Sequence, residues 1–256
     1  MQIGMMNNPA HDPVAEINWA AGHRFDYIDL TLEHPKAAAD LLDEDAVYAA
    51  IMRAGFGVIG HTAWYLPIAS PVARVRRAAI EEVASTFPIF ARLGAHLVNV
   101  HPDAGRSVMG QDENTRLNAA AFATLAEQAT AHGLRLIVEN IVGAYESVAA
   151  FQQFLAADPR IGWHYDIGHA QVRGNRSHEY LTAFGGRLAH VHLSDNSGRS
   201  DDHLPLGVGR LDWKRLVRQV KRTGYDGTIT LEVFADDRDY LLASRDRLRT
   251  AWNAAA

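Results

Sequence analysis

The chain has 256 residues, of which 48% are hydrophobic, and its formal net charge is −5. This length and apolar content allow a full hydrophobic core in one or two domains. The negative charge argues against a protein that merely coats nucleic acid, because such binding depends on Lys and Arg side chains that neutralise phosphates. The chain has no cysteine, which excludes disulfide bonds and thiolate metal sites.

The sequence also carries signals about location. The N-terminal stretch MQIGMMNNPAHDP has neither a basic segment nor a long apolar one, so we expect no secretory signal peptide. No apolar run approaches the ~18 residues that a membrane span requires. We therefore expect a soluble, cytoplasmic protein that does not contact a membrane.

Short apolar runs alternate with longer, Ala-rich amphipathic segments along the whole chain. The run LRLIVEN, for example, is dense in Leu, Ile and Val, as expected for a strand buried on both faces. Eight such runs predict strands at 2–6, 26–32, 57–61, 97–101, 135–139, 161–165, 188–193 and 228–233. Eight amphipathic segments predict helices near 11–21, 36–53, 70–92, 111–132, 146–157, 176–184, 211–222 and 236–252.

Local signals support several of these helix ends. Ser70 and Pro71 form a good N-cap and first-turn pair, which predicts a helix start at this point. Gly94, Gly133 and Gly224 each follow a predicted helix, where a left-handed residue often ends the last turn.

The regular alternation predicts one (β/α)8 barrel that occupies residues 1–256 as a single domain. An open, doubly wound sheet is the alternative fold. That fold usually has a Gly-rich phosphate-binding turn after its first strand, and GMMNNP is no such turn.

Six consecutive predicted strands, from the third to the eighth, each end in a histidine or a carboxylate. In a barrel of this kind, the carboxyl ends of the strands surround one mouth, where catalytic residues lie. A single residue of this type is usually a cap or a solvated loop residue, but six in succession indicate a shared site. They are His61, His101, Glu139, Asp166, His192 and Glu232.

More side chains of metal-binding type lie next to these strand ends. His169 follows in the motif DIGH, and Asp201 and His203 lie on one side of the extended stretch SDDH. Imidazole and carboxylate ligands suit Zn, Mn, Mg or Co, so the pattern predicts a divalent metal site. We expect His190 to point to the opposite face of its strand from His192, and to be packed rather than a ligand.

With these residues in hand, the chain resembles the xylose isomerase-like TIM-barrel superfamily. This group contains sugar and sugar-phosphate isomerases and epimerases, and also the endonuclease IV type of abasic-site repair enzymes. The resemblance covers nearly the whole chain and rests on FDYIDLTLEHP, LVNVHPDAG, LIVENI, HYDIGHA, HVHLSDNSGRSDDHLPLGVGRLDW and ITLEVF.

The resemblance implies two possible ligand sets. In the isomerases and epimerases, one divalent metal is held at positions that match Glu139, Asp166, His192 and Glu232. In the endonuclease IV branch, three zinc ions share nine ligands. Those positions match His61, His101, Glu139, Asp166, His169, His192, Asp201, His203 and Glu232, and the chain has all nine.

We favour a divalent-metal-dependent sugar or sugar-phosphate isomerase or epimerase that acts through a metal-stabilised enediolate. Glu139 and Glu232 would shuttle the proton, and His169 would hold a substrate hydroxyl. Relatives with 3-epimerase activity also use a second Glu and an Arg, for which Glu146 and Arg199 are the candidates. Further substrate contacts are expected from Asn140, Trp64, Tyr65 and Trp163.

The alternative is an endonuclease IV-like, zinc-dependent phosphodiesterase that cuts DNA at abasic sites. Glu139 would orient a metal-bridged hydroxide for attack on phosphorus. DNA would then be gripped by basic residues of the barrel mouth, namely Arg106, Arg173, Arg176 and Arg199. A non-catalytic metal- or sugar-binding module is a third possibility. These readings imply between one and three metal ions and leave the sugar and the oligomeric state open.

Overall fold

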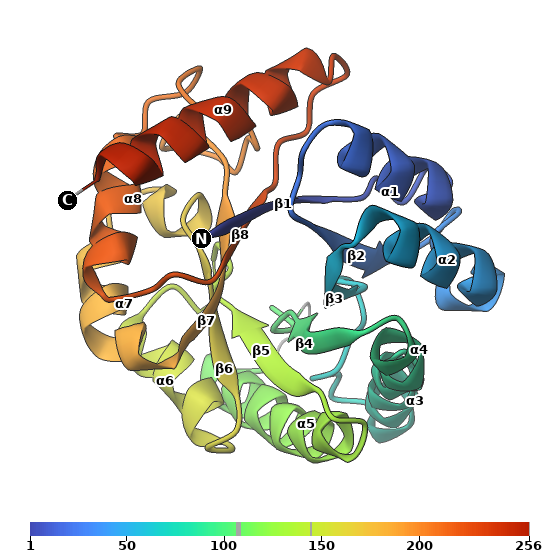
Figure 1. Cartoon of the computed structure of the whole chain (residues 1–256). Coiled ribbons are helices and arrows are strands. Elements are labelled where there is room, and N and C mark those ends of the chain that lie inside the picture. Colours follow the sequence, from blue (N-terminus) through green and yellow to red (C-terminus); the bar gives the residue numbers. More distant parts are fainter. Residues whose placement is uncertain (106–108, 144, 256) are drawn as a thin grey trace.

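The computed structural model describes residues 1–105, 109–143 and 145–255. Eight parallel strands form a closed barrel in chain order, and β8 pairs back onto β1 (Figure 1). The predicted (β/α)8 barrel is thus confirmed. The strands are β1 (Gln2–Met6), β2 (Tyr27–Leu32), β3 (Gly57–Thr62), β4 (Ala95–Val100), β5 (Arg135–Glu139), β6 (Gly162–Asp166), β7 (Leu188–Leu193) and β8 (Thr228–Leu231).

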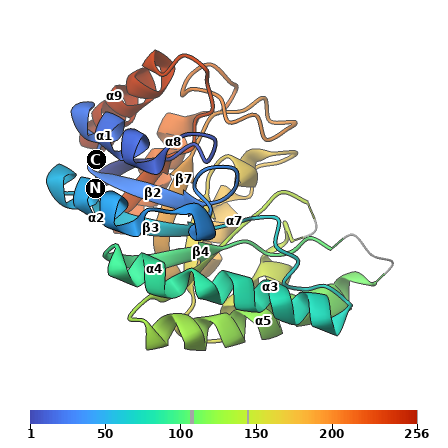
Figure 2. The ribbon, with the colours of Figure 1, turned by 90° about the vertical axis from the view of Figure 1, so that its right-hand side faces the viewer.

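Helices surround the barrel, and the loops that follow the strands extend from one end of it, opposite the two chain termini (Figure 2). Within the described ranges, none of the helices combines the length and the hydrophobicity of a membrane span. The helices are α1 (Pro13–Gly22), α2 (Glu44–Ala54), α3 (Ala73–Ser85), α4 (Phe87–Arg92), α5 (Gln111–Ala131), α6 (Val148–Ala156), α7 (Ser177–Phe184), α8 (Trp213–Arg222) and α9 (Asp239–Ala254).

The predicted single helix over 70–92 is wrong, because two helices occupy this segment. The first begins at Ala73 rather than next to Ser70, and Thr86 separates it from α4. Pro88 lies in the first turn of α4, where its missing N–H is tolerated; inside one continuous helix it would remove a hydrogen bond. The sequence TFP was therefore the signal for a boundary.

The predicted helix over 36–53 begins later than expected. The segment first forms a short 3-10 turn over Ala39–Leu41, and α2 starts only at Glu44. Asp43 caps this start, since its carboxylate accepts a hydrogen bond from the backbone N–H of Ala46. Gly55 ends the helix with a φ of 67°, a left-handed conformation that glycine adopts without strain.

Each barrel strand sends alternate side chains to two different environments. On β6, Trp163 and Tyr165 are fully buried, and Trp163 packs outwards against Tyr165 and against Phe184 of α7. The intervening His164 points into the barrel, where its ring lies 4.1 Å from the ring of His192 on β7. The outer layer is thus apolar, whereas the interior near the mouth is lined with polar side chains that are buried.

Candidate metal centre

Four side chains from the last four strands converge at the mouth of the barrel. Glu139 ends β5, Asp166 ends β6, His192 lies near the end of β7 and Glu232 follows β8. Each offers one ligand atom, and these atoms all lie within 4.8 Å of one another. Nitrogen and oxygen ligands lie about 2.0–2.2 Å from a bound zinc ion, so this spacing suits four ligands around one ion. We call these residues the four-residue group.

Two further groups flank the first one. His101 Nε2 lies 3.0 Å from Glu139 Oε2, and His61 Nε2 lies 3.8 Å from the same oxygen. In the other group, Asp201 Oδ2 lies 3.0 Å from His169 Nε2 and 2.9 Å from His203 Nε2. Since Glu139 belongs to two groups, the three groups together bring all nine expected ligands to one mouth.

Several oxygen and nitrogen atoms of these groups are buried without a hydrogen bond. Among the described residues, none is made by Asp166 Oδ2, Asp201 Oδ1 or His61 Nε2. Leaving such an atom unsatisfied costs about 1–3 kcal/mol. A cation would supply the missing partner, since zinc binds imidazole and carboxylate ligands and manganese suits carboxylates. The residues present therefore fit a divalent metal ion.

The electrostatics of the four-residue group are consistent with this fit. Burial raises the pKa of Asp166 to about 7. Burial has the same tendency at Glu232, but the neighbouring His192 outweighs it and lowers the pKa of Glu232. Burial disfavours charge on His192, yet Glu232 and Asp29 raise its pKa well above the ordinary value. A cation that binds here would displace protons from Asp166 and His192.

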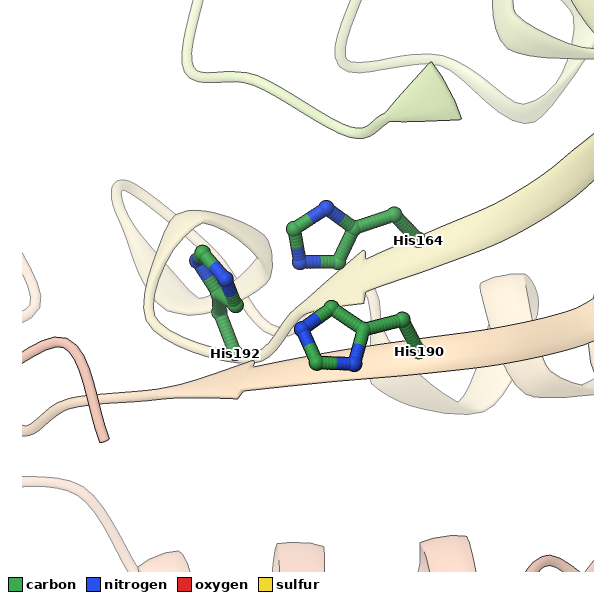
Figure 3. Close-up of side chains that lie close together, drawn as sticks. All are labelled: His164, His190 and His192. Atoms are coloured by element: carbon green, nitrogen blue, oxygen red, sulfur yellow. The ribbon is translucent and has the colours of Figure 1, made fainter. Parts of the chain in front are cut away.

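A layer of polar residues lies below the four-residue group, and sequence reasoning missed most of it. Asp29 Oδ2, from the middle of β2, lies 2.8 Å from His192 Nε2 and 3.1 Å from His190 Nε2. The prediction that His190 faces away from His192 is therefore wrong: residues two apart on a strand share a face. Figure 3 shows both rings beside His164 in the interior. The alternation in HYD and HVH was the available signal.

The expected substrate contacts occupy different environments. Trp64 and Tyr65, in the loop after β3, are 57% and 48% exposed, and Arg199 is exposed in the loop after β7. Asn140 is buried; its side chain donates to the backbone oxygen of Asp166 and accepts from Trp163 Nε1. Trp163 has no exposed surface, so the expectation that it packs on a sugar is wrong.

The remaining candidates lie on the rim of the mouth. Glu146 forms an ion pair of 2.8 Å with Arg176, and Arg173 is exposed in the same loop. Arg106 lies outside the described residues. Phe234, which sequence reasoning did not select, is 60% exposed and its ring lies 4.6 Å from the ring of His203. Its position two residues after Glu232 was the signal that could have identified it.

Comparison with known proteins gives a consistent result. The family described as xylose isomerase-like TIM barrel matches residues 17–251. An L-ribulose 3-epimerase from Methylomonas sp. (strain DH-1) is 25% identical over 232 residues, covering 85% of this chain and 77% of that enzyme. A solved structure described as a D-tagatose 3-epimerase-like protein covers 100% of this chain and 98% of its own, with a TM-score of 0.88 and 22% identity.

Other relatives match over a shorter stretch. An uncharacterized protein from Methanocaldococcus jannaschii is 28% identical over 169 residues, which are 62% of this chain and 58% of that protein. Across the first three curated relatives, the match spans between 54% and 59% of their length.

Proposed function

Because the chain belongs to the xylose isomerase-like TIM-barrel family, we propose that it is a divalent-metal-dependent epimerase or isomerase of a ketose or ketose phosphate. One observation carries the proposal: the ligand atoms of Glu139, Asp166, His192 and Glu232 lie within 4.8 Å of one another at the mouth. The L-ribulose 3-epimerase, similar over most of both chains, supports a sugar as the substrate class.

The four-residue group would hold the metal ion through its three carboxylates and one imidazole. When bound, a divalent ion acts as a Lewis acid that polarises the substrate carbonyl and stabilises negative charge on its oxygen. This makes the hydrogen on the neighbouring carbon acidic enough to be removed by a carboxylate.

Glu139 and Glu232 are the candidates for moving that proton. Both are buried, and histidines nearby outweigh burial and lower the pKa of each carboxyl, so both are ionised bases at neutral pH. They come from β5 and from the residue after β8, and thus approach the mouth from different strands. In an epimerisation, one carboxylate would take the proton from one face of the carbon. The other carboxylate, after taking up a proton from solvent, would return that proton to the opposite face, and exchange with solvent would then restore both groups.

The test is hydrogen exchange at the substrate. We would incubate Mn²⁺-loaded protein in D₂O with a panel of ketoses and ketose phosphates and follow the carbon-bound protons by NMR. The expected result is loss of the proton on the carbon next to the carbonyl, with appearance of the epimer. Absence of exchange with every sugar of the panel would reject the proposal.

A second candidate function is phosphodiester cleavage at abasic sites in DNA. The observation that favours it is the division of all nine expected ligands into three adjacent groups. Elemental mass spectrometry of the purified protein separates the two functions: about three zinc ions per chain favour the nuclease, and about one ion favours the sugar enzyme. Strand cleavage of a duplex with one abasic site is the direct assay, and no cleavage with any metal would dismiss this function.

A further inference from the structure

Asp29 lies in the barrel interior below the four-residue group, and its carboxylate is fully buried. Its Oδ2 atom receives three contacts: His192 Nε2 at 2.8 Å, His190 Nε2 at 3.1 Å and the Thr230 hydroxyl at 2.8 Å. Thr230 is in turn 2.7 Å from the hydroxyl of Tyr27. These contacts tie β2 to β7 and β8, strands that are not neighbours of β2 in the barrel.

The contact with Asp29 determines which nitrogen of His192 is free. An ionised carboxylate only accepts hydrogen bonds, so the Nε2 atom of His192 must carry a proton. When a cation binds, His192 becomes the neutral imidazole with a single N–H on Nε2, and its lone pair is then on Nδ1. That nitrogen lies 3.1 Å from Glu232 Oε2, on the side of the four-residue group.

We propose that Asp29 is a positioning residue, which fixes the ring and the Nε2–H form of His192 so that Nδ1 is presented to a divalent cation. This inference rests on the divalent-metal site of the proposed function. Carboxylates that orient a metal-binding histidine in this way fix its ring and tautomer, and their loss typically weakens metal binding by about 10–100-fold.

A cation held by the imidazoles themselves is the competing explanation for this layer. His164, His190 and His192 each have a nitrogen within 4.8 Å of the others (Figure 3). However, both nitrogens of His190 already have partners, because Nδ1 lies 2.7 Å from the Thr228 hydroxyl and Nε2 contacts Asp29. Hydrogen bonds thus account for the arrangement of His190 and His192 without a cation between the imidazoles. This favours the role of Asp29 as a positioning residue.

The first test compares Mn²⁺ affinity of the whole chain and two variants, with free Mn²⁺ measured by electron paramagnetic resonance. In Asp29→Asn, the new amide can donate to Nε2 and favour the Nδ1–H form of His192, so we expect binding about 10–100-fold weaker. Tyr27→Phe is the matched control, because it removes a buried hydroxyl that is two contacts away from Asp29 and three from His192. Its Mn²⁺ affinity should equal that of the unmodified chain.

The second test needs no variant and so does not depend on how Asp29→Asn folds. In ¹⁵N-labelled protein loaded with Zn²⁺, long-range NMR correlations of His192 should show a protonated Nε2 and a metal-bound Nδ1. A proton on Nδ1, or a folded Asp29→Asn variant that binds Mn²⁺ as tightly as the unmodified chain, overturns the role of Asp29. Neither measurement uses a sugar. If the unmodified protein binds the metal but acts on no sugar, the proposed reaction is refuted and the role of Asp29 is not. Unmodified protein that binds neither ion refutes both proposals.

Discussion

The Nε2 atom of His101 lies 3.0 Å from Oε2 of Glu139, the carboxylate that also completes the four-residue group. Its other oxygen, Oε1, lies 3.3 Å from Nδ1 of His169. Glu139 thus contacts one histidine from each of the two flanking groups, so its negative charge faces both of them.

Replacement of Glu139 by Gln should nearly abolish turnover while the protein stays folded. The amide keeps the shape of the side chain but can neither act as a base nor supply a charged ligand. We expect the rate of sugar epimerisation to fall by about 10²–10⁴-fold. Glu113→Gln is the control, because that carboxylate is on α5 and pairs with exposed Arg116. Full activity of the Glu139→Gln protein would remove Glu139 from the mechanism.

A pair of variants should separate the sugar reaction from DNA cleavage. His203 belongs to the group with His169 and Asp201, whereas Glu232 belongs to the four-residue group. For a sugar enzyme with one ion, Glu232→Gln should reduce turnover by about 10²–10⁴-fold and His203→Gln should leave turnover measurable. A three-zinc nuclease would lose activity in both variants. Parallel assays on ketoses and on abasic-site DNA decide between these patterns.

Metal binding should strengthen as the pH rises. Burial raises the pKa of Asp166 to about 7, and only its ionised form can ligate a cation. The protonated carboxyl therefore competes with the metal below that pH and ceases to compete above it. We expect tighter Mn²⁺ binding at about pH 8 than at about pH 6, with proton release on binding. Titration calorimetry in two buffers of different ionisation enthalpy measures both the affinity and the number of protons released. A Mn²⁺ affinity that is independent of pH would contradict the assignment of Asp166 as a ligand.

Two tryptophans should behave in opposite ways when truncated. Trp163 is fully buried and bonds to Asn140, so Trp163→Ala should destabilise the fold by about 3–5 kcal/mol. Trp64 is 57% exposed at the mouth, and Trp64→Ala should change stability by no more than about 0.5 kcal/mol. Urea unfolding followed by circular dichroism gives both values. If Trp64 contacts the sugar, its variant should raise KM without a loss of stability.

Much of the fold could be predicted because its signals are local. A buried strand is a continuous apolar run, and the ends of parallel strands in a barrel meet at one mouth. This logic brought His61 on β3 and Glu232 after β8 to the same mouth, although they lie far apart in the printed sequence. Helix boundaries were less certain, as the break at Thr86 illustrates, because amphipathic periodicity continues across it.

The role of Asp29 in the interior layer could not be identified in the same way. Asp29 lies in the middle of a strand, and its function depends on contacts with β7 and β8 that are remote in the chain. No local pattern distinguishes a buried aspartate that accepts from two histidines from one that caps a turn. The buried Asn140 has the same property, since its partners lie on the neighbouring strand β6, more than 20 residues further along the chain.

All residues of the four-residue group come from the second half of the chain, β5 to β8, while Asp29 comes from β2 in the first half. The two half-barrels are therefore chemically unequal. A chimera that joins the second half of this chain to the first half of a relative would inherit every member of the group. It would keep a carboxylate behind His192 only if the donated first half has an acidic residue at the matching position of its second strand.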